Sequence, residues 1–194
     1  MKPGWMRYWA SVSLFSGSLL SAQVPTQSAE ARAPKRVNEL RLAGLRPGKD
    51  SLERAIRLYR RPMLTADDGR SATWTDPCHR AAMFLDIELS QRLKSIRISH
   101  ADWLAGDCGP LKRSKWRTDK NLALGDPTKR VQALYGEPDS RIPSTNGRQQ
   151  LELLYYAFDW AGPNVPQIMT VLCTPEKEGK PGQVVEITLE AASL

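Results

Sequence analysis

The 194-residue chain is 41% hydrophobic and 25% charged, so it can bury a sizeable core and lacks the composition of a disordered protein. Its length fits one medium domain or two small ones. The formal net charge is +7, a moderate value that by itself does not indicate a nucleic-acid-binding protein.

The first 22 residues have the pattern of a secretory signal peptide, with Lys2 and Arg7 before an uncharged stretch from Tyr8 to Ala22. This stretch is about 15 residues long and rich in serine, whereas a membrane-spanning helix needs ~20 residues. We therefore predict cleavage before Gln23. Cleavage lowers the net charge from +7 to +5, because Lys2 and Arg7 leave without any acidic residue. The remaining moderate positive charge suits an anionic envelope surface or an acidic partner.

The mature product is expected to be periplasmic or secreted. No cysteine lies near the cleavage site, so a bacterial lipid anchor on cysteine is excluded and no stable membrane anchor is expected. Residues 23–41 are rich in Ala, Pro, Ser, Gln and Arg without periodicity, which predicts a flexible leader. Folded structure is expected to begin near Leu42.

Residues 42–100 are predicted to form a first α+β unit. Apolar side chains recur at helical spacing from Leu52 to Tyr59, and Asp50 and Glu53 have the spacing of a capping box. Alternation of apolar and polar residues between positions 83 and 99 predicts antiparallel strands with one face in water.

Residues 101–121 are predicted to join this unit to the next. The segment is basic and contains Trp103 and Trp116. We interpret it as a solvated linker, and the alternative is a basic and aromatic contact surface.

Residues 122–194 are predicted to form a second α+β unit. Asp126 can cap a helix that has Pro127 at its first position. Leu151–Phe158 is apolar on both faces apart from one glutamate, which indicates a central or partly covered strand. Val185–Glu190 alternates, which predicts a strand with one wet face.

The two units resemble each other. Leu45–Pro62 and Leu122–Pro138 both run from a glycine through a short helix to Leu-Tyr-x-x-Pro, and Ser95–Ile98 matches Glu186–Leu189 more loosely. The predicted fold is therefore α+β, with two tandem units produced by internal duplication, each a helix plus a three-stranded antiparallel sheet.

The stretch from Leu124 to Pro138, which contains Leu-Gly-Asp-Pro-Thr and Leu-Tyr-Gly-x-Pro, resembles the SmpA/OmlA-type small lipoproteins of outer-membrane barrel assembly. The tandem arrangement is similar to that of the beta-lactamase inhibitor protein. The resemblance covers the chain from Leu45 onward, but Arg60 and Arg61 stand where the family prefers glycine, and the lipid-bearing cysteine is absent. The resemblance implies a module that binds other proteins. It does not indicate which residues of this sequence would bind, because the motif does not define the family's binding face.

Three cysteines are present, and an oxidising compartment favours a disulfide. Cys78 and Cys108 lie in predicted loops or element ends, whereas Cys173 ends an apolar run. The favoured pair is Cys78–Cys108, which leaves Cys173 buried. Because Cys-x-x-Cys spacing is absent, and because His79 and His100 lie outside metal-ligand patterns, no metal site or cofactor is predicted.

Enzyme chemistry is not indicated. Asp86 and Glu88 share one face of a predicted strand, where an acid–base pair could act, so an envelope hydrolase that uses them is an alternative. Solvation of that strand face also explains both carboxylates. After the signal peptide the chain contains neither a Gly-x-Ser-x-Gly motif nor a phosphate loop.

Aromatic residues gather between positions 155 and 160, where a strand runs into a Gly-Pro loop. Tryptophan and tyrosine are enriched in interface hot spots, so an exposed aromatic there would anchor a partner. We expect an exported, non-enzymatic protein-binding module of the bacterial cell envelope, or alternatively an inhibitor of a secreted enzyme. The expected partner is another protein, not a nucleic acid. The predicted binding residues are Trp160, Tyr155, Tyr156, Trp74 and Arg97.

Overall fold

The computed structural model describes residues 38–104, 114–147, 149–158, 167–177 and 179–191. The signal peptide and most of the leader lie outside these residues, so export stays a prediction. The helices and strands are, in chain order, α1 (Leu52–Tyr59), β1 (Leu64–Thr65), β2 (Ser71–Asp76), the 3-10 helix η1 (Pro77–His79), β3 (Ala81–Ile87), β4 (Leu93–His100), α2 (Thr128–Tyr135), β5 (Ser140–Asn146), β6 (Gln149–Phe158), β7 (Gln167–Cys173) and β8 (Val184–Ala191).

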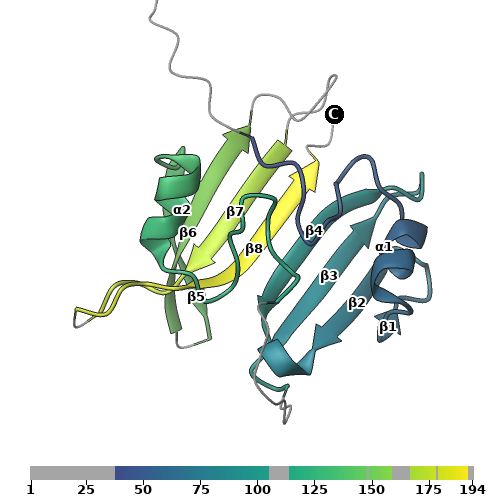
Figure 1. The fold of residues 1–194 in the computed structure, drawn as a ribbon, viewed down its shortest axis with the longest axis horizontal. Coiled ribbons are helices and arrows are strands. Elements are labelled where there is room, and N and C mark those ends of the chain that lie inside the picture. Colours follow the sequence, from purple (N-terminus) through teal and green to yellow (C-terminus); the bar gives the residue numbers. More distant parts are fainter. Residues whose placement is uncertain (1–37, 105–113, 148, 159–166, 178, 192–194) are drawn as a thin grey trace, which may run out of the picture. The chain divides into compact units, whose positions relative to one another are not determined.

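The strands form one eight-stranded antiparallel sheet in the order β1-β2-β3-β4-β8-β7-β6-β5 (Figure 1). The predicted fold of two helix-plus-three-stranded units is therefore wrong. Strand β4 pairs with β8, and Ser95 lies opposite Glu190 while Ile98 lies opposite Ile187. The pairing satisfies backbone groups that would be exposed at the edge of either half, so the two halves share one continuous sheet.

Two strands in this sheet were not expected. Strand β1 has only two residues, which is too short for a periodic signal. Strand β5 has the sequence Ser-Arg-Ile-Pro-Ser-Thr-Asn, in which polar residues and Pro143 hide the alternation, and nearly all of it is exposed. Proline is tolerated only where its missing N–H faces away from the ladder, as at a sheet edge. Both strands lie at edges, where few contacts constrain the sequence.

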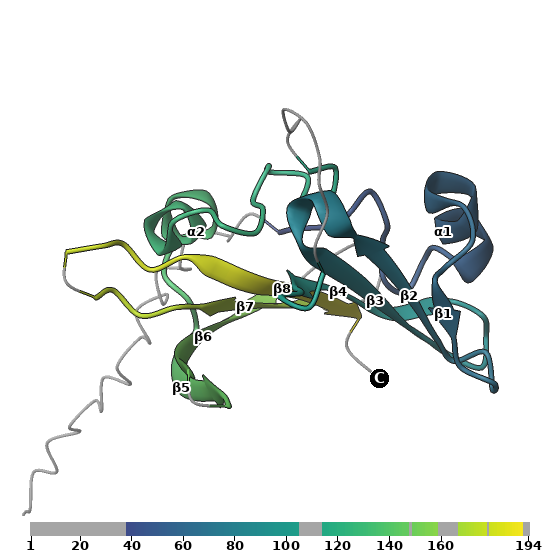
Figure 2. The same ribbon diagram turned by 90° about the horizontal axis from the view of Figure 1, so that it is seen from below.

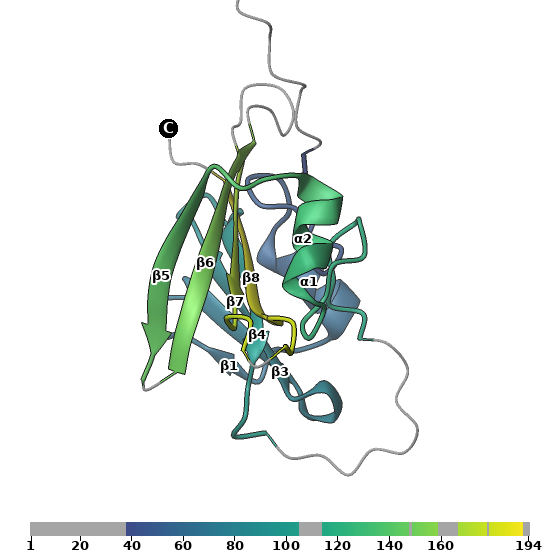
Figure 3. The same cartoon turned by 90° about the vertical axis from the view of Figure 1, so that its left-hand side faces the viewer.

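Both α-helices pack on the same face of the sheet (Figures 2 and 3). Helix α1 buries Ala55, and α2 buries Val131 and Tyr135. Alternate residues of the strands meet the helices and are almost fully buried, which explains why helices too short to be stable alone persist here. The strand residues in this core include Met83, Leu85, Ile96, Ile98, Leu154, Tyr156, Met169, Val171, Ile187 and Leu189.

Aromatic rings fill the core beneath α2. The ring of Tyr135 lies 5.9 Å from that of Tyr156 and 6.2 Å from that of Phe158, between centroids. Nearer α1, Tyr59 packs edge-on against Trp116 at 6.2 Å. Trp116 therefore belongs to the core, although it lies in the segment interpreted as a linker, whereas Trp103 is 65% exposed.

The chain before α1 is tied to the chain before α2. Ala43 donates its backbone N–H to the carbonyl of Arg117 at 2.9 Å. Upstream, the Glu39 carboxylate is 1% exposed and accepts a hydrogen bond from the Tyr135 hydroxyl at 2.6 Å. The backbone N–H groups of Leu40 and Asp119 also donate to it, at 3.0 and 3.3 Å. This buried network joins three distant segments and begins before Leu42, where the sequence places the leader.

The pKa of the Tyr135 hydroxyl is raised by its position in this network. Burial raises the pKa of Tyr135 above its ordinary value of 10, and the neighbouring Glu39 carboxylate raises it further. The Tyr135 hydroxyl also shares a hydrogen bond with Thr118 at 2.7 Å. Tyr135 therefore stays neutral and donates to the Glu39 carboxylate.

The aspartates before the helices do not cap them through their side chains. Asp50 accepts from the backbone N–H of Arg46 and Asp126 from that of Ala123, and neither helix has a side-chain cap bond. The predicted capping roles are therefore corrected: the two carboxylates close the preceding turns.

In the described part of the chain, no helix has the length and apolar character to cross a membrane.

Candidate functional site

The sheet face opposite the helices, called the open face below, is covered by neither helix (Figure 2), although Ala101 and Leu104 pack against Ala82 and Phe84 at its β3 end. Successive side chains of a strand point to opposite faces of the sheet, and one set of alternate side chains is buried against the helices. The other set therefore lies on the open face. The register aligns a central row of open-face residues across six neighbouring strands: Thr73, Phe84, Arg97, Thr188, Thr170 and Tyr155.

An aromatic–cation pair lies near the middle of this row. The Arg97 guanidinium carbon lies 4.6 Å from the centre of the Phe84 ring. Arg97 is exposed and Phe84 is half-buried. A cation over an aromatic face is attracted to the ring, and the contact holds the guanidinium in place while its donors remain available.

The part of the open face formed by β5, β6 and β7 is more apolar. Ile142, Leu153 and Leu172 lie side by side in the register, and Ile142 is 48% exposed. Tyr155 lies in the adjacent central row. Apolar and aromatic side chains on an uncovered face are typical of surfaces that contact another protein.

Three carboxylates project from the part formed by β3, β4 and β8. Asp86 accepts a hydrogen bond from the Ser95 hydroxyl, and Glu190 pairs with Lys94 at 3.8 Å. Glu186 accepts no hydrogen bond and makes no ion pair with any residue that the structure describes. Burial raises the pKa of Glu186, and the charge of Arg97 opposes this shift. Glu186 is thus a half-buried carboxylate without a direct partner in the described chain.

A cavity of about 390 Å³ lies beside Glu186. It forms where β4 ends and β8 begins, and Ser99 lies opposite Glu186 in the register. The cavity is lined in part by Glu186, Ser99, Leu172, His79, His100 and Gln149.

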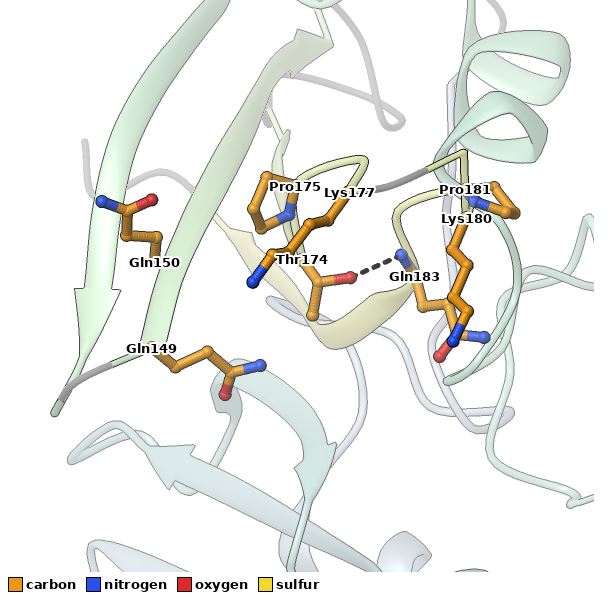
Figure 4. Close-up of a pocket in the computed structure, with 8 residues that line it drawn as sticks. All are labelled: Gln149, Gln150, Thr174, Pro175, Lys177, Lys180, Pro181 and Gln183. Carbon is orange, nitrogen blue, oxygen red and sulfur yellow. Dashed lines mark hydrogen bonds between the residues drawn. The ribbon is translucent and has the colours of Figure 1, made fainter.

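A second cavity of about 640 Å³ adjoins the first, since both are lined by Gln149, Thr174 and Gln183. Figure 4 shows it between the start of β6 and the connection from β7 to β8, which supplies Lys177 and Lys180. The Thr174 hydroxyl accepts the backbone N–H of Gln183 at 2.9 Å. The glutamine side chains offer both donors and acceptors, which suits a polar ligand such as a polypeptide.

Replacement of Glu186 tests whether its ionised carboxylate lowers the stability of the folded protein. We expect Glu186→Gln to make the folded protein more stable at neutral pH, because the ionised carboxylate is desolvated without a direct partner. A carboxyl group whose folded-state pKa is raised lowers stability above that pKa, and the penalty disappears as the pH falls towards the ordinary value of 4.5. Urea unfolding across this pH range measures the difference in the free energy of unfolding between wild type and Glu186→Gln. An equal difference at every pH would contradict a raised pKa of Glu186.

The structure brings together only some of the predicted binding residues. Arg97 and Tyr155 both lie in the central row. Trp74 and Tyr156 lie on the helix face, where they are 4% and 0% exposed, so their assignment to a binding surface is corrected. Their polar atoms are satisfied inside: Trp74 Nε1 donates to the carbonyl of Arg60, and the Tyr156 hydroxyl to that of Gly136. Trp160 lies outside the described residues.

Asp86 and Glu88 do not form a joint site. Glu88 follows the end of β3, and its carboxylate accepts from the Ser90 hydroxyl, whereas that of Asp86 accepts from Ser95. Neither residue lines the two cavities above. The geometry therefore gives the hydrolase alternative no support.

The cysteines occupy different environments. Cys78 lies in η1, and Cys108 lies outside the described residues, so their pairing stays a prediction. Cys173 is a buried free thiol at the end of β7, and burial raises its pKa to about 11, so this thiol is not a reactive nucleophile at neutral pH. Within the described residues, no group of three or more His, Cys, Asp or Glu side chains could hold a metal ion.

The two edges of the sheet are poor templates for an added strand. Strand β1 is only two residues long, and β5 contains Pro143, which cannot donate a backbone hydrogen bond. Short strands and edge prolines are the usual protections against edge-to-edge pairing. The open face is therefore a better candidate for recognition than either edge.

No protein-family model matches this sequence. No curated protein matches it either. Among solved structures, the chain is similar to a DUF4309 family protein (YjgB) from Bacillus subtilis, with 13% sequence identity and a TM-score of 0.48. The match covers 79% of this chain and 88% of that one. A similarity this low indicates nothing about function, and the resemblance to SmpA/OmlA-type lipoproteins stays a prediction.

Proposed function

We propose that this protein is a non-enzymatic protein-binding module of the bacterial cell envelope and that its open face contacts the partner. One observation carries the proposal. The central row presents Phe84, Arg97 and Tyr155 on a sheet face that neither helix covers. Arginine and tyrosine are among the residues most enriched in interface hot spots.

The polar and apolar parts of the face support the same conclusion. Ile142, Leu153 and Leu172 supply apolar area, while Thr170 and Thr188 supply hydroxyl groups between the aromatic residues. Protein interfaces combine an apolar centre with hydrogen-bonding groups in this way.

Site-specific photo-cross-linking in the producing cells tests the proposal. A benzophenone amino acid at Thr188 samples the open face, and one at Arg57 samples an exposed position on α1 as a matched control. We expect a covalent protein adduct from position 188 and none from position 57. Mass spectrometry of the adduct then identifies the partner.

Two further substitutions connect the adduct to the central row. We expect Arg97→Ala combined with Tyr155→Ala to lower the adduct yield at least fivefold, because hot-spot truncations cost more than about 1 kcal/mol each. Both side chains project from the open face and lie outside the helix-side core, so circular dichroism should show an unchanged fold. Equal adduct yields from positions 188 and 57, or no loss in the double variant, would contradict the proposal.

A further inference from the structure

Glu186 differs from the other carboxylates of the open face. Asp86 has the Ser95 hydroxyl, and Glu190 has Lys94, but the Glu186 carboxylate has no direct hydrogen-bond or ion-pair partner in the described chain. An ionised group held half-buried without a partner is costly. A cation that enters beside it would remove that cost, so the site favours a positively charged ligand over a neutral one.

Arg97 attracts the Glu186 carboxylate through its charge but makes no direct ion pair with it, and the charged groups that line the 390 Å³ cavity do not pair with Glu186 either. Arg80 pairs with Asp102 at 3.4 Å, and His79 Nδ1 lies 2.7 Å from the Asp76 carboxylate. His100 is exposed at the end of β4. With the Arg80–Asp102 and His79–Asp76 charges paired internally, Glu186 is the carboxylate of the cavity wall that makes no direct ion pair with a described residue.

Neutral acceptors surround the same space. Ser99 lies across from Glu186 in the register, and Asn146 and Gln149 line the same cavity, so a hydroxyl and two amide side chains are available there. A guanidinium group carries five N–H donors in a rigid plane, so it can pair with a carboxylate and still donate to nearby oxygens. Leu172 lies on the other side of Glu186 in the register and offers apolar surface for the methylene groups of a long side chain.

We propose that the cavity beside Glu186 holds an arginine side chain of the protein that binds the open face. The inference rests on the proposed function for the source of this arginine. The guanidinium pairs with the Glu186 carboxylate and donates to Ser99 and Gln149, while the stem lies along Leu172. A partner surface that fits here carries arginine beside apolar residues, which complements the adjacent carboxylate and apolar parts of the open face.

A titration with a single amino-acid probe tests the anchor without the partner. The probe is N-acetyl-argininamide, and N-acetyl-citrullinamide is its neutral isostere. We expect the arginine probe to cause saturable NMR shifts at the backbone amides of Ser99, Leu172 and Glu186 in the 15N-labelled full chain. The citrulline probe should cause no saturable change, since it has the shape of arginine without the charge.

Variants then assign the binding to one carboxylate. Glu186→Gln should weaken binding of the arginine probe at least tenfold, and Glu190→Gln, on the same strand and face, should change it less than twofold. Dispersed spectra of both variants confirm that they fold. Equal binding of the two probes, unchanged binding by Glu186→Gln, or no binding of the arginine probe to the wild-type chain would overturn the anchor.

The two proposals fail in different ways. Photo-cross-links from Thr188 without any arginine binding would overturn the anchor and leave the protein-binding face intact. Conversely, charge-specific binding of the arginine probe without an adduct from position 188 would overturn the proposed function and leave the cation site.

Discussion

We expect Glu39→Ala to lower the free energy of unfolding by about 3 kcal/mol, because it leaves the buried Tyr135 hydroxyl and several partly buried backbone donors without an acceptor. In the wild-type protein, Glu39 is 1% exposed and accepts from the Tyr135 hydroxyl and from backbone N–H groups, including those of Leu40 and Asp119. The Tyr135 hydroxyl belongs to a residue that is 3% exposed, so water does not readily replace the lost acceptor there. The loss should also loosen the contact between the chain before α1 and the turn before α2.

Urea unfolding followed by circular dichroism measures this change, and Glu53→Ala is the matched control. Glu53 lies on α1 in an exposed ion pair with Arg57 at 3.7 Å, and such a pair contributes only about 0.3–0.5 kcal/mol. Tyr135→Phe adds a second test, because it removes one donor and keeps the ring packed against Tyr156. If Glu39→Ala were no more damaging than Glu53→Ala, the buried network would not stabilise the fold.

We expect Gly182→Ala to lower the free energy of unfolding by about 3 kcal/mol or more. A Cβ atom at this position would lie 2.2 Å from the backbone oxygen of Thr174 and 2.8 Å from the Thr128 hydroxyl. The backbone cannot shift freely, because the Gly182 carbonyl accepts the N–H of Thr128 at the start of α2 at 2.8 Å. Overpacking of this kind typically costs 1–3 kcal/mol, and disruption of the hydrogen bond adds to it.

Gly179→Ala is the matched control for this substitution. Gly179 has a φ angle of +74° but open space around its Cα, so alanine there incurs only the strain of the left-handed conformation, about 1 kcal/mol. Thermal unfolding of the two variants separates the steric effect from the backbone effect. A smaller loss for Gly182→Ala than for Gly179→Ala would contradict the close approach of the chain at Thr174.

Local patterns in the sequence were enough to locate both helices and most of the central strands. The apolar repeat of Leu52–Tyr59 matches α1, and the alternation around Ser95–Ser99 and Val185–Glu190 matches β4 and β8. The same alternation indicates a sheet with one wet face, because each side chain in a strand points opposite to its neighbour. It also places Arg97 on the wet face.

Local patterns could not assign Tyr155 and Tyr156 to different faces. Both lie in a strand that is apolar on both sides, so periodicity alone gives no direction. The register of β6 with β7 and the position of α2 decide that Tyr156 is core and that Tyr155 lies half-buried on the open face. Of the two residues, only Tyr155 remains in the candidate site.

Length, composition and local periodicity therefore determined by themselves that this chain forms amphipathic helices and half-wet strands. The tertiary structure decided that β4 and β8 join the strands into one sheet and that Glu39 is a buried acceptor. It also decided that Glu186 lies beside a cavity without a direct hydrogen bond or ion pair to any described residue. The physical reason is that strand pairing and burial of a polar group depend on residues far apart in the chain. Local patterns report which face of an element is apolar, but they do not report what covers that face.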